Sequence, residues 1–301
     1  AIGYEIYGAW PLLTTLAPAN FFFSLTSPAV KPPKVFWVGS GLFEPFSTPF
    51  SPFCIFFKLI MNKELNDKLI LITGASSGIG KGLAKRLCRN GYNLILTSRS
   101  NEKLSQLKDE LSDFSEKIHL IACDLTNSDD IENLYKKTLE IGFVECIISN
   151  AGLGRFSSID QMSIEDWDIQ INTNLRPSFL IARLFVSQMK KNKTGHLVFI
   201  NSVAGKYGHS FSNSTAYVSS KYALKGFADS LRTELRDYNV KVSSIYPGAI
   251  DTEFWDAINV DFPRDEMLSI DDLSETILHV VKAPNSSVIE DVVVRRTAGD
   301  F

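Results

Sequence analysis

The sequence predicts an α/β protein built on a doubly wound parallel sheet. Short, unbroken apolar runs occur from residue 65 onward and indicate strands that are buried on both faces. Segments with helical spacing of apolar residues separate these runs, which is typical of parallel strands connected by helices. A glycine-rich turn follows the first run directly. We therefore expect a single domain over residues 65–301, with helices on both faces of the sheet.

The expected elements alternate along the chain. Strands are predicted at 69–73, 94–97, 118–123, 146–149, 196–201, 242–246 and 292–294. Helices are predicted at 78–90, 101–111, 128–141, 168–190, 216–238 and 270–282. The first helix shows the pattern, since Ile79, Leu83 and Leu87 share one face. Pro177 has no N–H for the Thr173 carbonyl, which predicts a kinked turn near Asn174 within the fourth helix.

Residues 1–64 differ from the rest and are expected to form an irregular extension rich in proline and phenylalanine. The first sixty residues hold eight of the twelve prolines, fourteen aromatic residues and only five charged ones. No uncharged apolar run approaches the roughly 18 residues that span a membrane. Three interpretations stay open: translated upstream sequence with Met61 as the true start, a lineage-specific tail that docks on the surface, or an unfamiliar targeting segment.

Composition excludes several classes of function. The 301 residues are 45% hydrophobic and 22% charged, with a formal net charge of −3. Because no basic run is present, we expect no nucleic-acid partner. The four cysteines, Cys54, Cys88, Cys123 and Cys146, form no CxxC pair and do not cluster with histidines, so we expect reduced thiols and no metal site. A cytoplasmic location fits this pattern.

The turn after the first strand has the composition of a phosphate-binding loop. It contains Gly74, Ser76, Ser77, Gly78, Ile79 and Gly80 and opens directly into a helix. The free N–H groups and the dipole of a helix N-terminus attract a pyrophosphate. Gly74 allows the tight turn, Gly78 the close approach of phosphate, and Gly80 the packing of helix on sheet. The sequence thus predicts a Rossmann-type dinucleotide site.

The Thr-Gly-x-x-x-Gly-x-Gly spacing of this loop resembles the short-chain dehydrogenase/reductase family, in particular its NADP-preferring carbonyl and 3-oxoacyl reductases. The resemblance extends from Lys68 to about Thr252. It implies a nicotinamide cofactor, a small carbonyl or alcohol substrate, and assembly as a homodimer or homotetramer through helices 168–190 and 216–238.

Cofactor preference is decided near the end of the second strand. An acidic residue there would hold the ribose 2′-hydroxyl of NAD. This sequence has Arg99 instead, and a guanidinium pairs well with a 2′-phosphate. Ser76 can add a hydroxyl to the same group. We therefore expect NADP(H) to be favoured over NAD(H), the alternative being that Arg99 is a solvated surface residue.

Three further stretches match cofactor-binding positions of the family. Asp124 and Leu125 follow the third strand, where the family places the adenine, although Asp124 also suits a turn cap. Asn150, Ala151 and Gly152 follow the fourth strand, and Asn150 suits a purely structural bridge equally well. The resemblance also assigns nicotinamide contacts to Pro247, Gly248, Ile250 and Thr252, the alternative being a simple Pro-Gly turn.

Tyr217 and Lys221 lie four residues apart on a predicted helix and share one face. A neighbouring ammonium is expected to lower the pKa of the phenol, which suits Tyr217 to general acid–base catalysis. The resemblance adds contact of both residues with the cofactor, substrate orientation by Ser202, and Asn174 as the fourth catalytic residue. Asn172 is the competing amide.

These residues predict an NADP(H)-dependent oxidoreductase that interconverts a carbonyl and an alcohol, with Tyr217 as general acid and base. An NAD-dependent alcohol, polyol or steroid dehydrogenase is the alternative, followed by a non-catalytic nucleotide sensor. Ser202 and Tyr217 are separated by more residues than is usual, in a loop where Ser212 and Ser214 are rival hydroxyls. Between Thr252 and Leu268 we expect a lid that includes Phe254, Trp255, Ile258, Val260 and Phe262.

Overall fold

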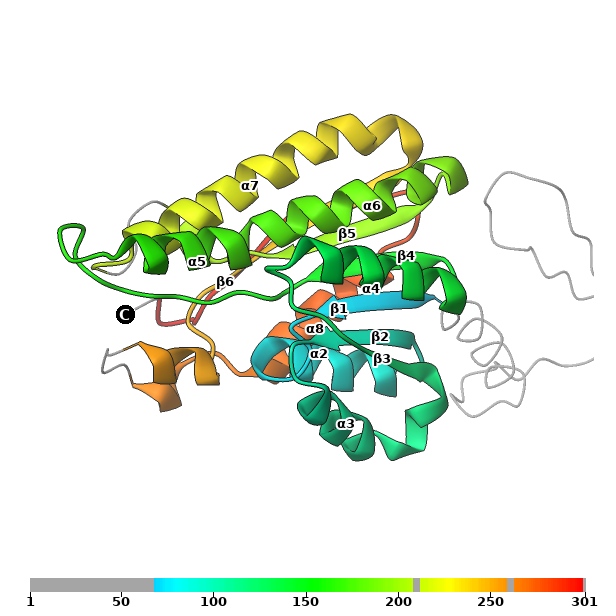
Figure 1. The fold of residues 1–301 in the computed structure, drawn as a ribbon, viewed down its shortest axis with the longest axis horizontal. Helices are drawn as coiled ribbons and strands as arrows, with labels where there is room; N and C mark the ends of the chain where they lie inside the picture. The colour runs from blue at the N-terminus through cyan, green and yellow to red at the C-terminus, as the bar shows by residue number, and fades with distance from the viewer. Residues whose placement is uncertain (1–67, 208–211, 259–262, 300–301) are drawn as a thin grey trace, which may run out of the picture. The chain divides into compact units, whose positions relative to one another are not determined.

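A computed structural model describes residues 68–207, 212–258 and 263–299. Its sheet has seven parallel strands in the order β3-β2-β1-β4-β5-β6-β7 (Figure 1). The strands are β1 (Leu69–Thr73), β2 (Asn93–Ser98), β3 (Ile118–Ala122), β4 (Val144–Ser149), β5 (Gly195–Ile200), β6 (Val240–Pro247) and β7 (Asp291–Val294). The chain runs outward to β3 and then returns to place β4 beside β1. This reversal creates the switch point at which such sheets bind dinucleotides.

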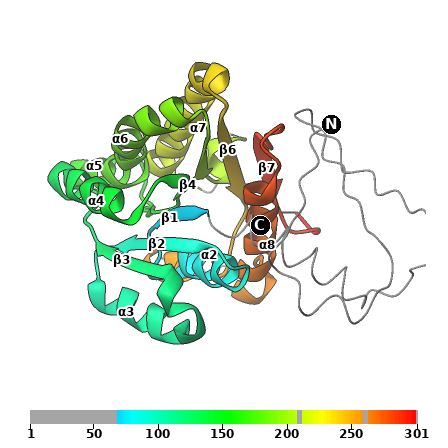
Figure 2. The same ribbon diagram turned by 90° about the vertical axis from the view of Figure 1, so that its right-hand side faces the viewer.

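Helices cover both faces of the sheet (Figure 2). They are α2 (Gly78–Arg89), α3 (Asn101–Glu110), α4 (Ser128–Ile141), α5 (Ile164–Asn174), α6 (Arg176–Asn192), α7 (Thr215–Leu235) and α8 (Ile270–Lys282). One buried cluster joins the sheet to α2, α3 and α8, and a second joins it to α4, α6 and α7. Alternate residues of β1 enter opposite clusters, Ile70 the first and Leu71 the second. The predicted doubly wound Rossmann-type sheet is confirmed.

The single helix expected at 168–190 is wrong, because two helices occupy this stretch. Helix α5 already begins at Ile164, where the Ser163 side chain accepts a hydrogen bond from the Asp166 N–H and caps it. Helix α6 begins at Arg176, with Pro177 in its first turn. Proline is tolerated there because the N–H groups of a first turn have no helical partner. The break at Leu175 lies one residue from the turn that Pro177 predicts.

The three cysteines among the described residues, Cys88, Cys123 and Cys146, are buried free thiols, as expected. Burial raises the pKa of each, to about 11 for Cys88 and about 12 for the other two. The described residues contain no cluster of side chains that could hold a metal ion. Nor does any described helix combine the length and apolarity that crossing a membrane requires. The expectations for residues 1–64 and Cys54 fall outside the described residues.

His196 on β5 makes stability depend on pH. Its Nε2 lies 2.8 Å from the Ser243 hydroxyl, and burial lowers its pKa to about 3. Since the unfolded chain takes up a proton near pH 6.5 and the folded chain does not, stability falls as pH drops from 6.5 toward 3. This residue should cost about 2 kcal/mol of unfolding free energy between pH 6.5 and 5.

Urea unfolding of His196→Gln, measured across this range, is expected to show a shallower pH dependence than the wild type. The Gln amide reaches the place of Nε2 and does not titrate. His279→Gln, on the exposed side of α8, is the matched control for replacing a histidine by glutamine. Equal slopes for the wild type and His196→Gln would contradict the prediction.

Candidate active site

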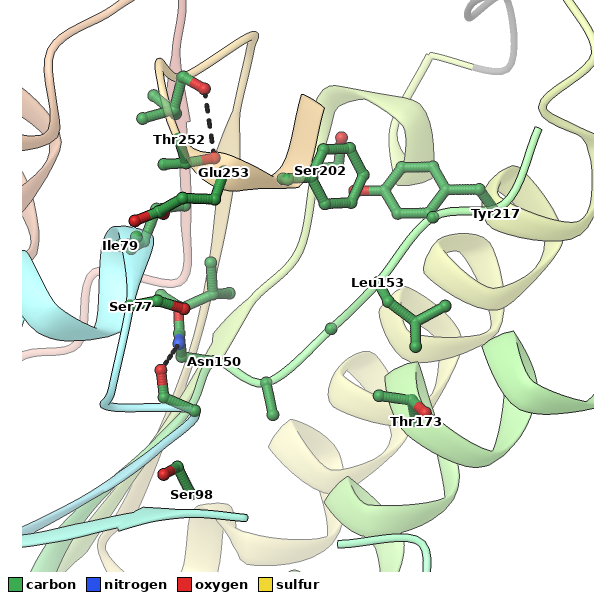
Figure 3. A pocket seen from close by; sticks show the side chains of 18 of the residues that line it. Ser77, Ile79, Ser98, Asn150, Leu153, Thr173, Ser202, Tyr217, Thr252 and Glu253 are labelled. Atoms are coloured by element: carbon green, nitrogen blue, oxygen red, sulfur yellow. Dashed lines mark hydrogen bonds between the residues drawn. The ribbon is translucent and has the colours of Figure 1, made fainter. Parts of the chain in front are cut away.

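One cavity of about 480 Å³ opens at the carboxyl ends of the strands (Figure 3). Every predicted site residue lines it except Gly80, which packs against Gly74, and Asn174, which is hydrogen-bonded to Leu153. The residues predicted and found here are Gly74, Ser76, Ser77, Gly78, Ile79, Arg99, Asp124, Leu125, Asn150, Ala151, Gly152, Ser202, Tyr217, Lys221, Pro247, Gly248, Ile250 and Thr252. The structure thus brings residues from both halves of the sheet to one site.

The glycine-rich turn has a backbone that other residues would not adopt easily. Gly74 and Gly78 have φ angles of 63° and 50°. A Cβ on Gly80 would lie 2.2 Å from the Gly74 carbonyl oxygen. The Ser77 side chain does not cap α2, so the first N–H groups of this helix keep their capacity for an anion. The turn therefore fits a pyrophosphate.

Asn150 bridges the two central strands, as one of its two predicted roles requires. Its Nδ2 donates to the carbonyl oxygens of Thr73 at 2.9 Å and Gly74 at 3.2 Å. In return the Thr73 hydroxyl accepts from the N–H groups of Asn150 and Ala151. Thr73, which the sequence did not single out as a site residue, thereby fixes β4 against the glycine-rich turn.

Two cations lie at the end of the cavity beyond β2. Arg99 is exposed, and its guanidinium makes no hydrogen bond or ion pair with any described residue. Lys103, in the first turn of α3, lines the same wall and also has no ion pair among the described residues. The sequence reasoning missed Lys103, although a cation four residues after Arg99 at a helix start was a usable signal.

Asp124 caps a turn, which was the alternative to a cofactor contact. Its Oδ1 accepts from the N–H of Thr126 at 2.9 Å and from its hydroxyl at 2.8 Å. These bonds, with a smaller contribution from the nearby charge of Arg99, hold the pKa of Asp124 below its usual value. The side chain still lines the cavity.

Tyr217 and Lys221 project from α7 as predicted, and both are buried, with 9% and 4% of their surface exposed. Burial raises the pKa of Tyr217 to about 12, and a hydrogen bond with the Ser202 side chain lowers it less. Burial lowers the pKa of Lys221 to about 8. Lys221 Nζ donates to the Ile200 carbonyl at 3.0 Å and lies 5.8 Å from the Tyr217 ring centroid. Burial therefore outweighs the lowering of the phenol pKa that was expected from the neighbouring ammonium, so the net shift is upward.

The structure separates Asn174 from its competitor, since Asn174 is 2% exposed and Asn172 faces outward. Asn174 Oδ1 accepts from the Leu153 N–H at 2.8 Å. Its Nδ2 donates to the Leu153 carbonyl and to the Ser220 hydroxyl, both at 2.9 Å. The side chain thus ties the segment after β4 to α7 beside Lys221.

Comparison with known proteins identifies the family. The short chain dehydrogenase family model matches residues 68–261. The chain belongs to the short-chain dehydrogenase family. It is an oxidoreductase with a Rossmann-type fold.

The matches between this chain and individual relatives extend over nearly the whole length of each relative. Sepiapterin reductase of Chlorobaculum tepidum is 29% identical over 241 residues, which are 77% of this chain and 98% of the relative. An alcohol dehydrogenase from the archaeon Thermococcus sibiricus, complexed with 5-hydroxy-NADP, has a TM-score of 0.70 at 28% identity, over 76% of this chain and 97% of its own. A metagenomic short-chain oxidoreductase in complex with NADP has a TM-score of 0.68 at 31% identity, over 77% and 99%.

The part of the cavity beside Tyr217 is aromatic in this short-chain dehydrogenase. Phe156 and Phe254 line the cavity, with ring centroids 5.8 Å and 5.7 Å from that of Tyr217. Trp255 packs edge-on against Phe254 and donates its Nε1–H to the Ile250 carbonyl at 2.8 Å. Neither Ser212 nor Ser214 lines the cavity.

The predicted lid is described only in part. Ile258 packs with Trp255 in a small buried cluster. Val260 and Phe262 lie outside the described residues. Phe156, which the sequence did not single out, closes the cavity from the segment after β4. The contact between Phe156 and Tyr217 joins the segment after β4 to α7, so it depends on the path of that segment across the site.

Proposed function

We propose that the protein is an NADP(H)-dependent oxidoreductase that interconverts a carbonyl and an alcohol, with Tyr217 as general acid and base. The observation that carries this proposal is the buried Tyr217 hydroxyl, which meets the Ser202 side chain on the same cavity as the glycine-rich turn. Lys221 lies one helical turn further along. The names of the NADP-bound relatives support the choice of cofactor.

The chain supplies position, a proton and charge. The glycine-rich turn would hold the pyrophosphate of NADP(H), and Arg99 and Lys103 would pair with its 2′-phosphate. When bound, NADPH supplies a hydride for the carbonyl carbon. Tyr217, whose pKa is about 12, is protonated at neutral pH and donates its proton to the substrate oxygen. Ser202 donates to the same oxygen and orients it.

Lys221 assists the proton transfer through its charge. Its pKa of about 8 leaves it mostly cationic at neutral pH, so it favours the phenolate that Tyr217 becomes. We also expect that carbonyl groups freed at the turn near Asn174 hold a water that relays protons toward Lys221. The assembly as a homodimer or homotetramer and the cytoplasmic location stay predictions.

The reaction class is tested by following NADPH oxidation with benzaldehyde, hexanal and cyclohexanone, and NADP⁺ reduction with the matching alcohols. Turnover of at least one pair is expected. A protein that binds NADPH tightly but turns over none of a broad carbonyl panel is a nucleotide sensor, and the proposal is then wrong.

Cofactor preference is tested by Arg99→Asp. The substitution removes the 2′-phosphate partner and adds a like charge, so the KM for NADPH should rise about 10- to 100-fold, as expected for loss of a charge-assisted hydrogen bond. Arg89→Asp makes the same charge change at the exposed end of α2, away from the cavity, and should leave this KM unchanged. Better use of NADH than of NADPH by the wild type would contradict the preference.

A further inference from the structure

Two side chains of helix α5 form hydrogen bonds with backbone groups of the segment after β4, as a neighbouring strand would. Gln170 Oε1 accepts from the Arg155 N–H at 3.0 Å, and Gln170 Nε2 donates to the Arg155 carbonyl at 3.2 Å. Asn174, one turn later on the same face, makes the same pair of bonds with Leu153. Two side-chain amides thus satisfy both backbone groups of alternate residues in an extended segment that belongs to none of the described strands.

The Gln170 amide is committed to this contact. Its side chain is fully buried, and its Nε2 also donates to the Asp166 carbonyl at 2.9 Å. Removing the amide would leave backbone groups of Arg155 without a partner in a partly buried place, which is costly. Gln170 itself does not line the cavity, so any effect on the reaction passes through Arg155 and its neighbours.

The segment that Gln170 holds forms one wall of the substrate side. Gly154, Arg155 and Phe156 all line the cavity. A Cβ on Gly154 would lie 2.7 Å from the Phe254 ring and 3.1 Å from the Phe156 ring, so the two rings converge above this glycine. A small backward movement of the segment would therefore withdraw Phe156 from Tyr217 and widen the cavity where a carbonyl must approach.

We propose that Gln170 is a positioning residue for the carbonyl substrate, acting by fixing Arg155 so that Phe156 closes the cavity beside Tyr217. This inference rests on the proposed function and deepens it. Two residues of α5 then have separate roles. Asn174 fixes Leu153 beside the catalytic lysine, and Gln170 fixes the cavity wall that faces the substrate. The glycine-rich turn and Arg99 belong to other elements and are untouched.

The test compares Gln170→Leu and Gln170→Glu with Gln161→Leu, an exposed glutamine used as control. Steady-state kinetics use whichever of benzaldehyde, hexanal or cyclohexanone the wild type reduces fastest, and NADPH affinity is measured by fluorescence titration. Gln170→Leu should raise the carbonyl KM at least tenfold, because a small displacement of the groups that position a substrate weakens its productive binding strongly. The NADPH Kd should stay within twofold of the wild-type value. Gln170→Glu, which keeps the acceptor for the Arg155 N–H, should lie between Leu and the wild type.

Amide hydrogen exchange of segment 152–157 gives a second readout that needs no substrate. In Gln170→Leu the amides of this segment should exchange faster, while those of residues 74–80 should exchange at the wild-type rate. Gln170→Glu provides the same comparison if the Leu variant does not fold. An unchanged carbonyl KM, an equal loss of NADPH affinity, or unchanged exchange would each overturn the inference. If the wild type reduces no carbonyl, the proposed function fails, while the exchange result still decides whether Gln170 fixes the segment.

Discussion

Tyr217→Phe is expected to remove carbonyl reduction while leaving NADPH binding intact. The variant lacks only the hydroxyl that meets the Ser202 side chain, while Lys221 Nζ donates to the Ile200 carbonyl. General acid–base catalysis contributes a factor of roughly 10² to 10⁴, so kcat should fall by at least that much. The NADPH Kd should stay within about twofold, because the ring and its contacts with Phe156 and Phe254 remain.

The measurement is NADPH oxidation in the steady state, with NADPH affinity from fluorescence titration. Tyr222→Phe, which removes a hydroxyl from an exposed tyrosine of the same helix, is the matched control and should keep full activity. A Tyr217→Phe enzyme that retains more than about a tenth of wild-type kcat would show that another group delivers the proton.

Gly80→Ala is expected to damage both folding and cofactor binding. Its Cβ would lie 2.2 Å from the Gly74 carbonyl oxygen and 2.7 Å from the Asn150 amide, so backbone must shift. Overpacking of this kind costs about 1–3 kcal/mol of unfolding free energy. Because the carbonyl of Gly74 belongs to the glycine-rich turn, the NADPH Kd should rise together with the loss of stability.

The control for this prediction is Gly226→Ala on α7, where a Cβ meets nothing within 4 Å. Alanine is the better helix former by about 1 kcal/mol, so this variant should be slightly more stable than the wild type. Thermal unfolding and NADPH titration of both variants decide the matter. A Gly80→Ala protein with wild-type stability and affinity would mean that the turn has more room than its geometry indicates.

The sequence was sufficient for most of the fold because the inner strands are largely buried on both faces and appear as continuous apolar runs. The sequence was insufficient to predict the structure where one residue is compatible with two local conformations. Pro177 is compatible with a kinked helix and equally with the first turn of a new one. Ser163 caps α5 and places its start before residue 168. Only together with the break at Leu175 does this cap show that the stretch forms two helices rather than one.

Motif spacing placed nearly all of the predicted site residues on one cavity, since each motif follows a strand and the carboxyl ends of parallel strands meet. Gln170 and Phe156 could not be found in this way, because their contacts depend on how a loop returns across the site. The direction of the Tyr217 pKa shift was also out of reach, because spacing reveals the neighbouring ammonium but not the depth of burial.

The reactivity of the buried cysteine thiols can be used to measure how often this protein unfolds. Only a thiolate reacts with maleimides or disulfide reagents, and the folded chain keeps Cys88, Cys123 and Cys146 both covered and protonated. With Cys54 replaced by serine, labelling of Cys88 on α2 or Cys146 on β4 would require the packing between the sheet and its helices to open. Modification rates would then read the opening equilibrium directly, without an introduced probe.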